Sequence, residues 1–426
     1  MIELGLLLAA FLAFLLLGAP VALAMGLGVG VYALVFGLPP VIVAQSLMQG
    51  LDGTAFTAIP YFFLAGAIMN RGGMSARLLR LARAVLGHLR GGLAHTNVGA
   101  SVVFAGVSGS AVADAAAVGS VMIPAMRKDG YGGAYAAAVT ATSATIGLVV
   151  PPSIPLVIYG LFTGADIGAL FLAGVMPGLL MGAFLLAVTL AIARRRDHPR
   201  SPFAGWSEIG VALRGGALAL AMPVIVVGAL VGGFATTAEI GAVAAAYAVL
   251  VTLVLREAET GALWLACKEA AADSAKVLIV IAVSGAFVWI VAAEGSAREA
   301  ATWLAETGLS AGATLALVAA LLLLLGTVLE PVTLLVVIVP TLATAVAPLG
   351  VDLVQLGVVA VLASAIGLVT PPVGLLLFLT AAQAEVPVTS VVREAAPFLL
   401  ALAVLLAAVV LVPGLTLWLP GLMAGG

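Results

Sequence analysis

The stretch Val107-Ser108-Gly109-Ser110-Ala111-Val112-Ala113-Asp114 decides how the chain is read, because it places small polar residues and a carboxylate inside a long apolar segment. That segment, residues 92–126, has about 35 residues, whereas about 20 suffice to span a bilayer as one helix. Irregular backbone is tolerated at membrane depth only where protein or a water-filled cavity covers it. The stretch therefore predicts a re-entrant helical hairpin whose tip lines a site.

The same arrangement occurs twice in the chain. An acid is followed ten residues later by a proline at Asp114 and again at Glu330, and the sequence of residues 146–152 is echoed at 366–372. The copies lie 216 residues apart for the acids and 220 for the Pro-Pro pairs. A nearly constant offset indicates duplication. The chain is thus expected to consist of two halves with one plan.

Composition places the protein in the membrane. Hydrophobic residues make up 64% of the chain, charged residues 8%, and the mean hydropathy is +1.28. Soluble domains carry about 25% charged residues. The apolar runs are continuous rather than alternating, which argues against a transmembrane barrel. Cys267 is the only cysteine, so no intrachain disulfide is possible. We expect an all-α polytopic membrane protein that keeps residues 1–18 as a span.

The apolar runs give the expected order of elements. In the first half we expect two short spans, a third segment to about Asn70 bent near Pro60, a basic amphipathic helix, the hairpin, a broken span and a further span. The expected ranges are 2–17, 21–36, 71–90, 92–126, 134–162 and 168–193. In the second half they are 215–233, 238–255, 275–293, a polar segment 294–309, a hairpin 310–347, a broken span 355–381 and a final span 396–418.

Five full crossings and one hairpin in each half imply opposite orientations, an inverted repeat. The expected divisions are a first repeat 1–193, a cytoplasmic connector 194–213 and a second repeat 214–426. With the N-terminus outside, 16 of the 17 basic residues, Arg256 included, fall on or near the cytoplasmic side, and only Arg298 falls outside. This predicts that His198 is cytoplasmic and that Asp352 and Gly426 are periplasmic.

Motifs exclude several kinds of chemistry and favour ion coordination. No phosphate-binding loop or His-Glu-x-x-His is present, so neither an ATP motor nor a metalloprotease is indicated. Hard cations such as sodium prefer several oxygen ligands. A hairpin tip facing a broken helix offers them twice. The first set is Ser108, Gly109, Ser110, Thr145, Val149 and Val150. The second set is Gly326, Thr327, Ser364 and Thr370.

Two intramembrane acids have open roles at this point. Asp114 and Glu330, expected to be buried, either neutralise a cation or carry a proton, or they hydrogen-bond helix-start amides and hold the hairpin tips in shape. Asn97, near the hairpin entrance, is expected to be a structural hydrogen-bonding residue.

Three of these motifs resemble the large membrane subunit of tripartite ATP-independent periplasmic (TRAP) transporters. They are residues 108–115, the Pro151-Pro152-Ser153-Ile154-Pro155 segment, and residues 367–374. The resemblance covers nearly the whole chain. One departure is Glu330, where the family more often has aspartate.

The resemblance implies a sodium-driven importer of small organic acids in a bacterial inner membrane, working by elevator motion of the two-hairpin domain. It implies a periplasmic binding protein and a small four-helix membrane subunit as partners, no nucleic-acid partner, no enzyme activity and no cofactor besides the coupling ion. By family likeness, the sodium ligands are Ser108, Gly109, Ser110 and Val150 at one site and Gly326, Thr327 and Thr370 at the other. The wider set for sodium or substrate adds Asp114, Thr145, Pro151, Glu330 and Pro371.

Two alternatives remain at the level of sequence. A stand-alone ion-coupled carboxylate symporter of related fold would need no binding protein. The other alternative is a membrane enzyme or an assembly scaffold, and turnover in detergent without any gradient would favour the enzyme.

Overall fold

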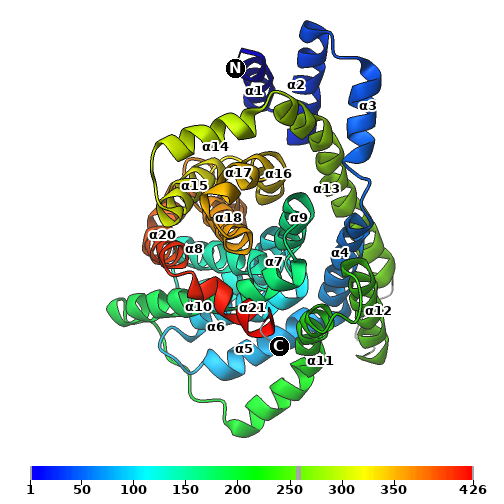
Figure 1. Ribbon diagram of the computed structural model, residues 1–426. Helices are drawn as coiled ribbons and strands as arrows, with labels where there is room; N and C mark the ends of the chain where they lie inside the picture. Colours follow the sequence, from blue (N-terminus) through cyan, green and yellow to red (C-terminus); the bar gives the residue numbers. More distant parts are fainter. Residues whose placement is uncertain (1, 256–260, 425–426) are drawn as a thin grey trace.

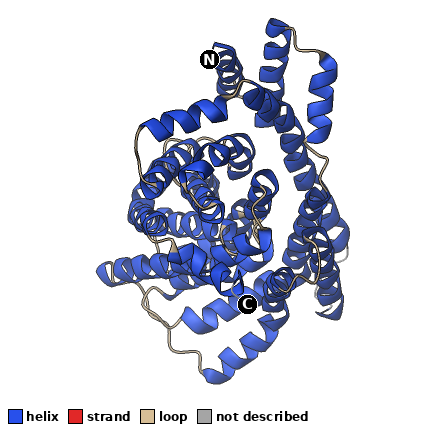
Figure 2. Ribbon diagram, in the orientation of Figure 1, coloured by secondary structure: helices blue, strands red, loops and turns tan. Residues whose placement is uncertain are grey.

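The structure is a computed structural model that describes residues 2–255 and 261–424. Within these ranges the chain forms helices and connecting loops and has no β-strand (Figure 2). The all-helical fold expected from the sequence is confirmed. Arg256 and Gly426, which the topology prediction used, lie outside the described residues.

The first half of the chain follows the predicted order closely. The elements here are α1 (Ile2–Leu16), α2 (Val21–Phe36), α3 (Pro40–Gln49), α4 (Ala58–Met69), α5 (Ser75–Leu86), α6 (Gly92–Ser108), α7 (Ala111–Lys128), α8 (Gly133–Ala144), α9 (Ile154–Thr163) and α10 (Ile167–Arg195).

The third predicted span is two helices, so the expected bend near Pro60 is wrong. The chain breaks instead between Gln49 and Ala58, where a short 3-10 turn, Thr54–Thr57, separates α3 from α4. Pro60 lies in the first turn of α4. A proline there removes an amide that has no helical partner in any case, so it does not bend the helix. The predicted basic helix begins at Ser75 after a π-helical turn, Asn70–Met74.

The second half contains the predicted elements with different bounds. They are α11 (Trp206–Val231), α12 (Thr237–Leu255), α13 (Ala262–Ala293), α14 (Ser296–Glu306), α15 (Ala311–Gly326), α16 (Pro331–Val337), α17 (Val339–Val346), α18 (Leu353–Gly367), α19 (Leu375–Ala384), α20 (Val388–Leu411) and α21 (Gly414–Ala424).

The predicted polar segment of this half is present, whereas the predicted single final span is wrong. The polar segment 294–309 contains the helix α14, which starts after Gly295 in the left-handed conformation. The final span is two helices, because α20 ends at Leu411 and Val412 has a non-helical backbone immediately before Pro413. Proline disfavours a helical conformation in the residue that precedes it.

Both predicted hairpins and both broken spans are present. The first hairpin is α6 and α7, and the second is α15 followed by the bent pair α16 and α17, whose axes differ by 49°. Each broken span places a proline pair between two helices: α8 and α9 flank one pair, and α18 and α19 flank the other.

The helices form an inner bundle and a band along one side of it. Helices α1 to α4 and α11 to α13 contact one another and make the band, which runs from the top of Figure 1 down its right-hand side. The hairpins, the broken spans, α10 and α20 make the inner bundle. Helix α5 leads from the band into the first hairpin, and α14 leads from it into the second.

The surface of the protein matches a lipid environment. Helices α10, α11, α12, α13 and α20 are long and apolar enough to cross a membrane. Large apolar side chains on the outside are strongly exposed, among them Leu34 at 87% and Val224 at 72%. The protein is therefore a multi-pass membrane protein, as the composition predicts.

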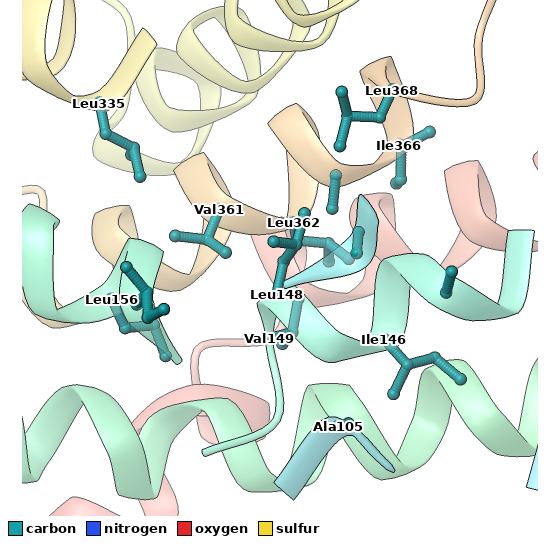
Figure 3. Close-up of a cluster of buried hydrophobic side chains, with 14 of the residues drawn as sticks. Ala105, Ile146, Leu148, Val149, Leu156, Leu335, Val361, Leu362, Ile366 and Leu368 are labelled. Carbon is teal, nitrogen blue, oxygen red and sulfur yellow. The ribbon is translucent and has the colours of Figure 1, made fainter. Parts of the chain in front are cut away.

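The centre of the inner bundle holds the two broken spans together. Figure 3 shows Leu148 and Val149, from the first break, near Leu362 of α18. All three side chains are buried. Because the interior is close-packed, this cluster fixes the position of both breaks, against which the hairpin tips rest.

Candidate functional site

The tip of the first hairpin is shaped by three consecutive residues. Helix α6 ends at Ser108, Gly109 adopts φ 60° and ψ 14°, and Ser110 is extended. A residue with a side chain rarely adopts the conformation of Gly109. The Ser110 hydroxyl then caps α7 by accepting a hydrogen bond from the Ala113 amide at 3.4 Å.

The Asp114 side chain contacts the end of α6 across the hairpin tip and does not cap a helix. Its side chain is completely buried, and its Oδ1 accepts a hydrogen bond from the Ser108 hydroxyl. The Ser110 amide donates to the same hydroxyl oxygen at 3.2 Å. Oδ2 accepts no hydrogen bond from any described residue and faces Gly147, where an added Cβ would lie 2.5 Å from it. A buried carboxylate oxygen without a donor needs a cation or a proton.

The tip rests in the break between α8 and α9. The Pro152 carbonyl oxygen lies 3.0 Å from the position of a Cβ on Gly109. The Pro151 carbonyl points toward α6, at 3.7 Å from a Cβ on Gly106. The structure therefore brings the predicted Ser108, Gly109, Ser110, Asp114 and Pro151 together.

Other residues of the break face a different way. The Val149 carbonyl points at α10, 2.5 Å from a Cβ built on Gly174, so the structure does not bring this oxygen to the hairpin tip. The Val150 side chain packs against Gly178 of the same helix. Thr145 is fully buried, and its hydroxyl donates to the Thr142 carbonyl at 2.7 Å.

Buried polar residues deeper in the first hairpin are structural. The Asn97 side-chain amide donates to the Thr140 hydroxyl at 2.7 Å, and the Ser101 hydroxyl donates to that of Ser143 at 2.9 Å. These bonds join α6 to α8 in the bundle interior. The hydrogen bond predicted for Asn97 is present, while its Oδ1 has no partner among the described residues.

The second tip approaches its broken helix by backbone contact. A Cβ on Gly367 would lie 2.4 Å from the Gly326 carbonyl carbon, so only glycine fits there. The Thr327 carbonyl accepts a hydrogen bond from the Gly374 amide at 3.3 Å. Gly326 and Thr327 thus lie against the segment that contains Thr370.

Hydroxyl groups around the second tip donate inward to helix carbonyls. Thr327 donates to Leu324 at 2.8 Å, Thr370 to Ile366 at 2.7 Å and Ser364 to Val361 at 2.9 Å. Their hydrogens are engaged, and the oxygen lone pairs remain as acceptors. Such oxygens suit a hard cation.

Glu330 differs from the prediction. It occupies the N-cap position of α16, but its side chain makes no capping hydrogen bond and is exposed rather than buried. The cause is its place at the tip, before the helix begins, whereas Asp114 lies within α7 and is covered by the break. Pro371 is likewise exposed. The two acids are therefore not structurally equivalent.

The two tips share one small cavity. Its volume is about 90 Å³, and its walls include Gly109 and Ser110 from one tip and Glu330 and Pro331 from the other. Phe63 of α4 closes it from the band.

A larger cavity of about 410 Å³ adjoins it, since Phe63 and Ser110 line both. It lies between the band and the first hairpin. The acids that line it are Asp114, Glu269 and Asp273, and no lysine or arginine is among its described lining residues.

Sequence reasoning missed several of these residues. Gly147 and Pro152 contact the first tip, and Gly374 contacts the second, yet only their places in or near the proline pairs distinguish them in the sequence. Phe63 and Glu269 belong to helices distant in sequence from the hairpins. No local pattern could have assigned them to the cavity.

Comparison with known proteins agrees with the resemblance seen in the sequence motifs. Residues 8–415 match the family model described as tripartite ATP-independent periplasmic transporter, DctM component. The chain is 37% identical over 383 residues to the sialic acid TRAP transporter large permease of Vibrio cholerae, covering 90% of each chain. It is also 37% identical to the C4-dicarboxylate TRAP transporter large permease of Pseudomonas aeruginosa, covering 88% of each.

A solved structure supports the fold. The YdaH transporter of Alcanivorax borkumensis superposes with a TM-score of 0.59 over 86% of each chain, at 16% sequence identity. At that identity the similarity concerns the fold alone.

Proposed function

The chain belongs to the DctM family of large permease components of TRAP transporters, and on this premise we propose that it imports small organic acids coupled to sodium. The relatives named above carry sialic acid and C4-dicarboxylates, which are all carboxylates at neutral pH. The proposed substrate class is therefore small carboxylates, and the complete transporter determines which acid is carried.

The observation that carries the proposal is the charge of the larger cavity. Three carboxylates line it: Glu269 is paired with Arg71, Asp273 is paired with Lys276 at 2.8 Å, and Asp114 has no ion pair with any described residue, so Asp114 is the charge left without compensation. An organic anion entering it alone would meet repulsion that grows as water is excluded. Bound cations remove that repulsion. Substrate binding is then favourable only when sodium is bound, and this requirement couples substrate uptake to sodium uptake.

The volumes of the two cavities support the larger one as the substrate site. The 90 Å³ space between the tips is too small for a sialic acid or a four-carbon diacid, whereas 410 Å³ suits a small organic acid. Ser110 of the first tip lines both spaces, so it would adjoin the substrate as well as the proposed sodium site.

For sodium we propose two sites with different ligands. The first uses oxygens of Ser108, Ser110 and Asp114, carbonyls of Gly109 and Val150, and the adjacent Thr145 and Pro151. The second uses Gly326, Thr327 and Thr370, with Pro371 and Glu330 at its margin. The unpartnered Oδ2 of Asp114 and the inward-donating hydroxyls support this assignment.

The arrangement of the helices supports an elevator motion. The two halves would form an inverted repeat, in which the inner bundle moves as one body along the band. Helices α5 and α14 would serve as the arms that connect the two parts. As in a tripartite system, we propose a periplasmic binding protein that delivers the acid and a small membrane subunit beside the band.

The test is uptake by the complete transporter in vesicles. The purified chain, reconstituted with its small membrane subunit and its binding protein, is given a labelled organic acid with either sodium or potassium outside at a fixed membrane potential. Uptake that needs sodium and all three proteins supports the proposal. Undiminished uptake in potassium overturns the sodium sites, and uptake by this chain alone favours the stand-alone symporter.

A further inference from the structure

Helix α5 forms one wall of two adjoining cavities of opposite character. One, of about 570 Å³, separates α5 from the first hairpin. Its far wall is apolar, with Phe104, Val118, Val121 and Met122, whereas its other lining residues include Asn70, Arg71, Ser75 and Thr96. The other, of about 360 Å³, is polar, and His88, Ser201 and Glu208 contribute to it. The two cavities share Arg80, Arg83 and Leu93. Two arginines therefore stand at the boundary between a polar and an apolar space.

The charges at this boundary do not cancel. Arg80 forms an ion pair with Glu208 at 2.9 Å. Arg83, one helical turn further along the same face, has neither an ion pair nor a side-chain hydrogen bond with any described residue. Two arginines and one glutamate leave one positive charge uncompensated. A ligand that fits this boundary carries a negative charge at one end.

Aromatic side chains place the boundary at the depth of the membrane surface. Phe203 and Trp206 lie beside the polar cavity, are 46% and 80% exposed, and pack edge to face on each other. Phe203 also packs on His88 of the polar cavity. Exposed tryptophans gather where hydrocarbon meets the headgroups. The apolar cavity then extends toward the hydrocarbon.

We propose that this pair of cavities binds an anionic phospholipid, with its phosphate at Arg80 and Arg83 and an acyl chain along Val118, Val121 and Met122 of α7. The occupant is a lipid rather than a free anion, because the apolar cavity continues directly from the arginines. The lipid would fill the cleft between the helix that leaves the band and the first hairpin. The inference does not depend on sodium coupling or on the identity of the substrate.

The experiment counts lipids retained by the purified protein. The wild-type chain and its variants are purified in the presence of equal phosphatidylglycerol and phosphatidylcholine, and bound lipids are counted by native mass spectrometry. Arg83→Gln should lower phosphatidylglycerol retention about fivefold, as one arginine near an anionic surface contributes about 1 kcal/mol. Arg195→Gln, at an exposed arginine without a partner among the described residues, should leave retention unchanged.

A second variant tests the acyl-chain half of the site. Val121 is 51% exposed and lines the apolar cavity, so Val121→Trp should fill that space without altering charge or folding. It should lower retention of phosphatidylglycerol as well. Equal loss in Arg83→Gln and Arg195→Gln, or full retention in both cavity variants, would overturn the proposal. Displacement of the lipid by glycerol 3-phosphate at equal concentration would show an anion site only and would also overturn it.

Discussion

A methyl group added to Gly109 tests the first tip more sharply than removal of any side chain. Gly109→Ala imposes two separate costs. The left-handed conformation costs an alanine about 1–2 kcal/mol. In addition, the new Cβ would lie 3.0 Å from the Pro152 carbonyl oxygen, so the tip must shift by a few tenths of an ångström. The second cost moves the oxygens that would hold sodium.

Gly130 provides the matched control. It also has a positive φ, 88°, but nothing lies within 4 Å of a Cβ built on it. Gly130→Ala therefore carries the conformational cost without the contact. The difference between the two variants isolates the effect at the tip.

The assay is thermal unfolding of the purified transporter at increasing sodium concentrations, with potassium keeping ionic strength constant. An ion that binds only the folded state raises stability by mass action. Losing one ligand costs about 1–3 kcal/mol, so half-maximal stabilisation in Gly109→Ala should need at least about fivefold more sodium. Gly130→Ala should lower the melting temperature but respond to sodium like the wild type. Identical sodium responses in both variants would refute the role of the tip.

Three further changes give separate readouts. Gly367→Ala would force a Cβ against the Gly326 backbone and should destabilise the fold by about 1–3 kcal/mol, measured by thermal unfolding, and wild-type stability would contradict the close approach. Asp114→Asn keeps the shape of the tip but removes a buried charge, so it should weaken sodium stabilisation about tenfold or more without lowering stability in potassium, and an unchanged sodium response would contradict a ligand role. Burial, with the nearby charge of Arg196, lowers the pKa of His198 in the connector, so the unfolded chain binds its proton first as pH falls through about 6.5. Stability should therefore fall between pH 7 and pH 5, and fall less in His198→Gln; equal losses would contradict this.

The sequence predicts much of the fold because its strongest signals are local. The small polar stretch around Gly109 and the two proline pairs interrupt long apolar runs, and each interruption in the structure lies where those residues stand. The wrong bounds have local causes too. Pro60 predicts a bend only if it lies inside a helix, and the sequence does not show where that helix begins. Helix α4 begins directly after Thr57, so Pro60 lies in its first turn, where a proline does not bend the helix.

The candidate site could be predicted only in part. The tips were found because each carries its own pattern, but the cavity between them depends on how distant segments pack. Glu330 and Asp114 match in the sequence pattern, since each precedes a proline by ten residues, yet Glu330 is exposed and Asp114 is fully buried. Phe63 and Glu269 reach the cavities from the band through tertiary packing alone.

The structure indicates a better position than residue 198 for testing the predicted topology. His198 is only half exposed and lies 4.6 Å from the Tyr131 ring, centroid to centroid, so a cysteine there would label poorly whichever side it faced. Pro199 is exposed and adjacent. Cysteine at 199 should resist an impermeant reagent in intact cells and react after the membrane is opened. Labelling from outside would contradict the inverted repeat.

The most direct test of the central claim is the ratio of sodium to substrate entering vesicles that contain the complete transporter. Initial fluxes of labelled sodium and labelled organic acid are measured in the same preparation. Two sites, one at each hairpin tip, predict at least two sodium ions for each acid. Entry of the acid without accompanying sodium would contradict the account.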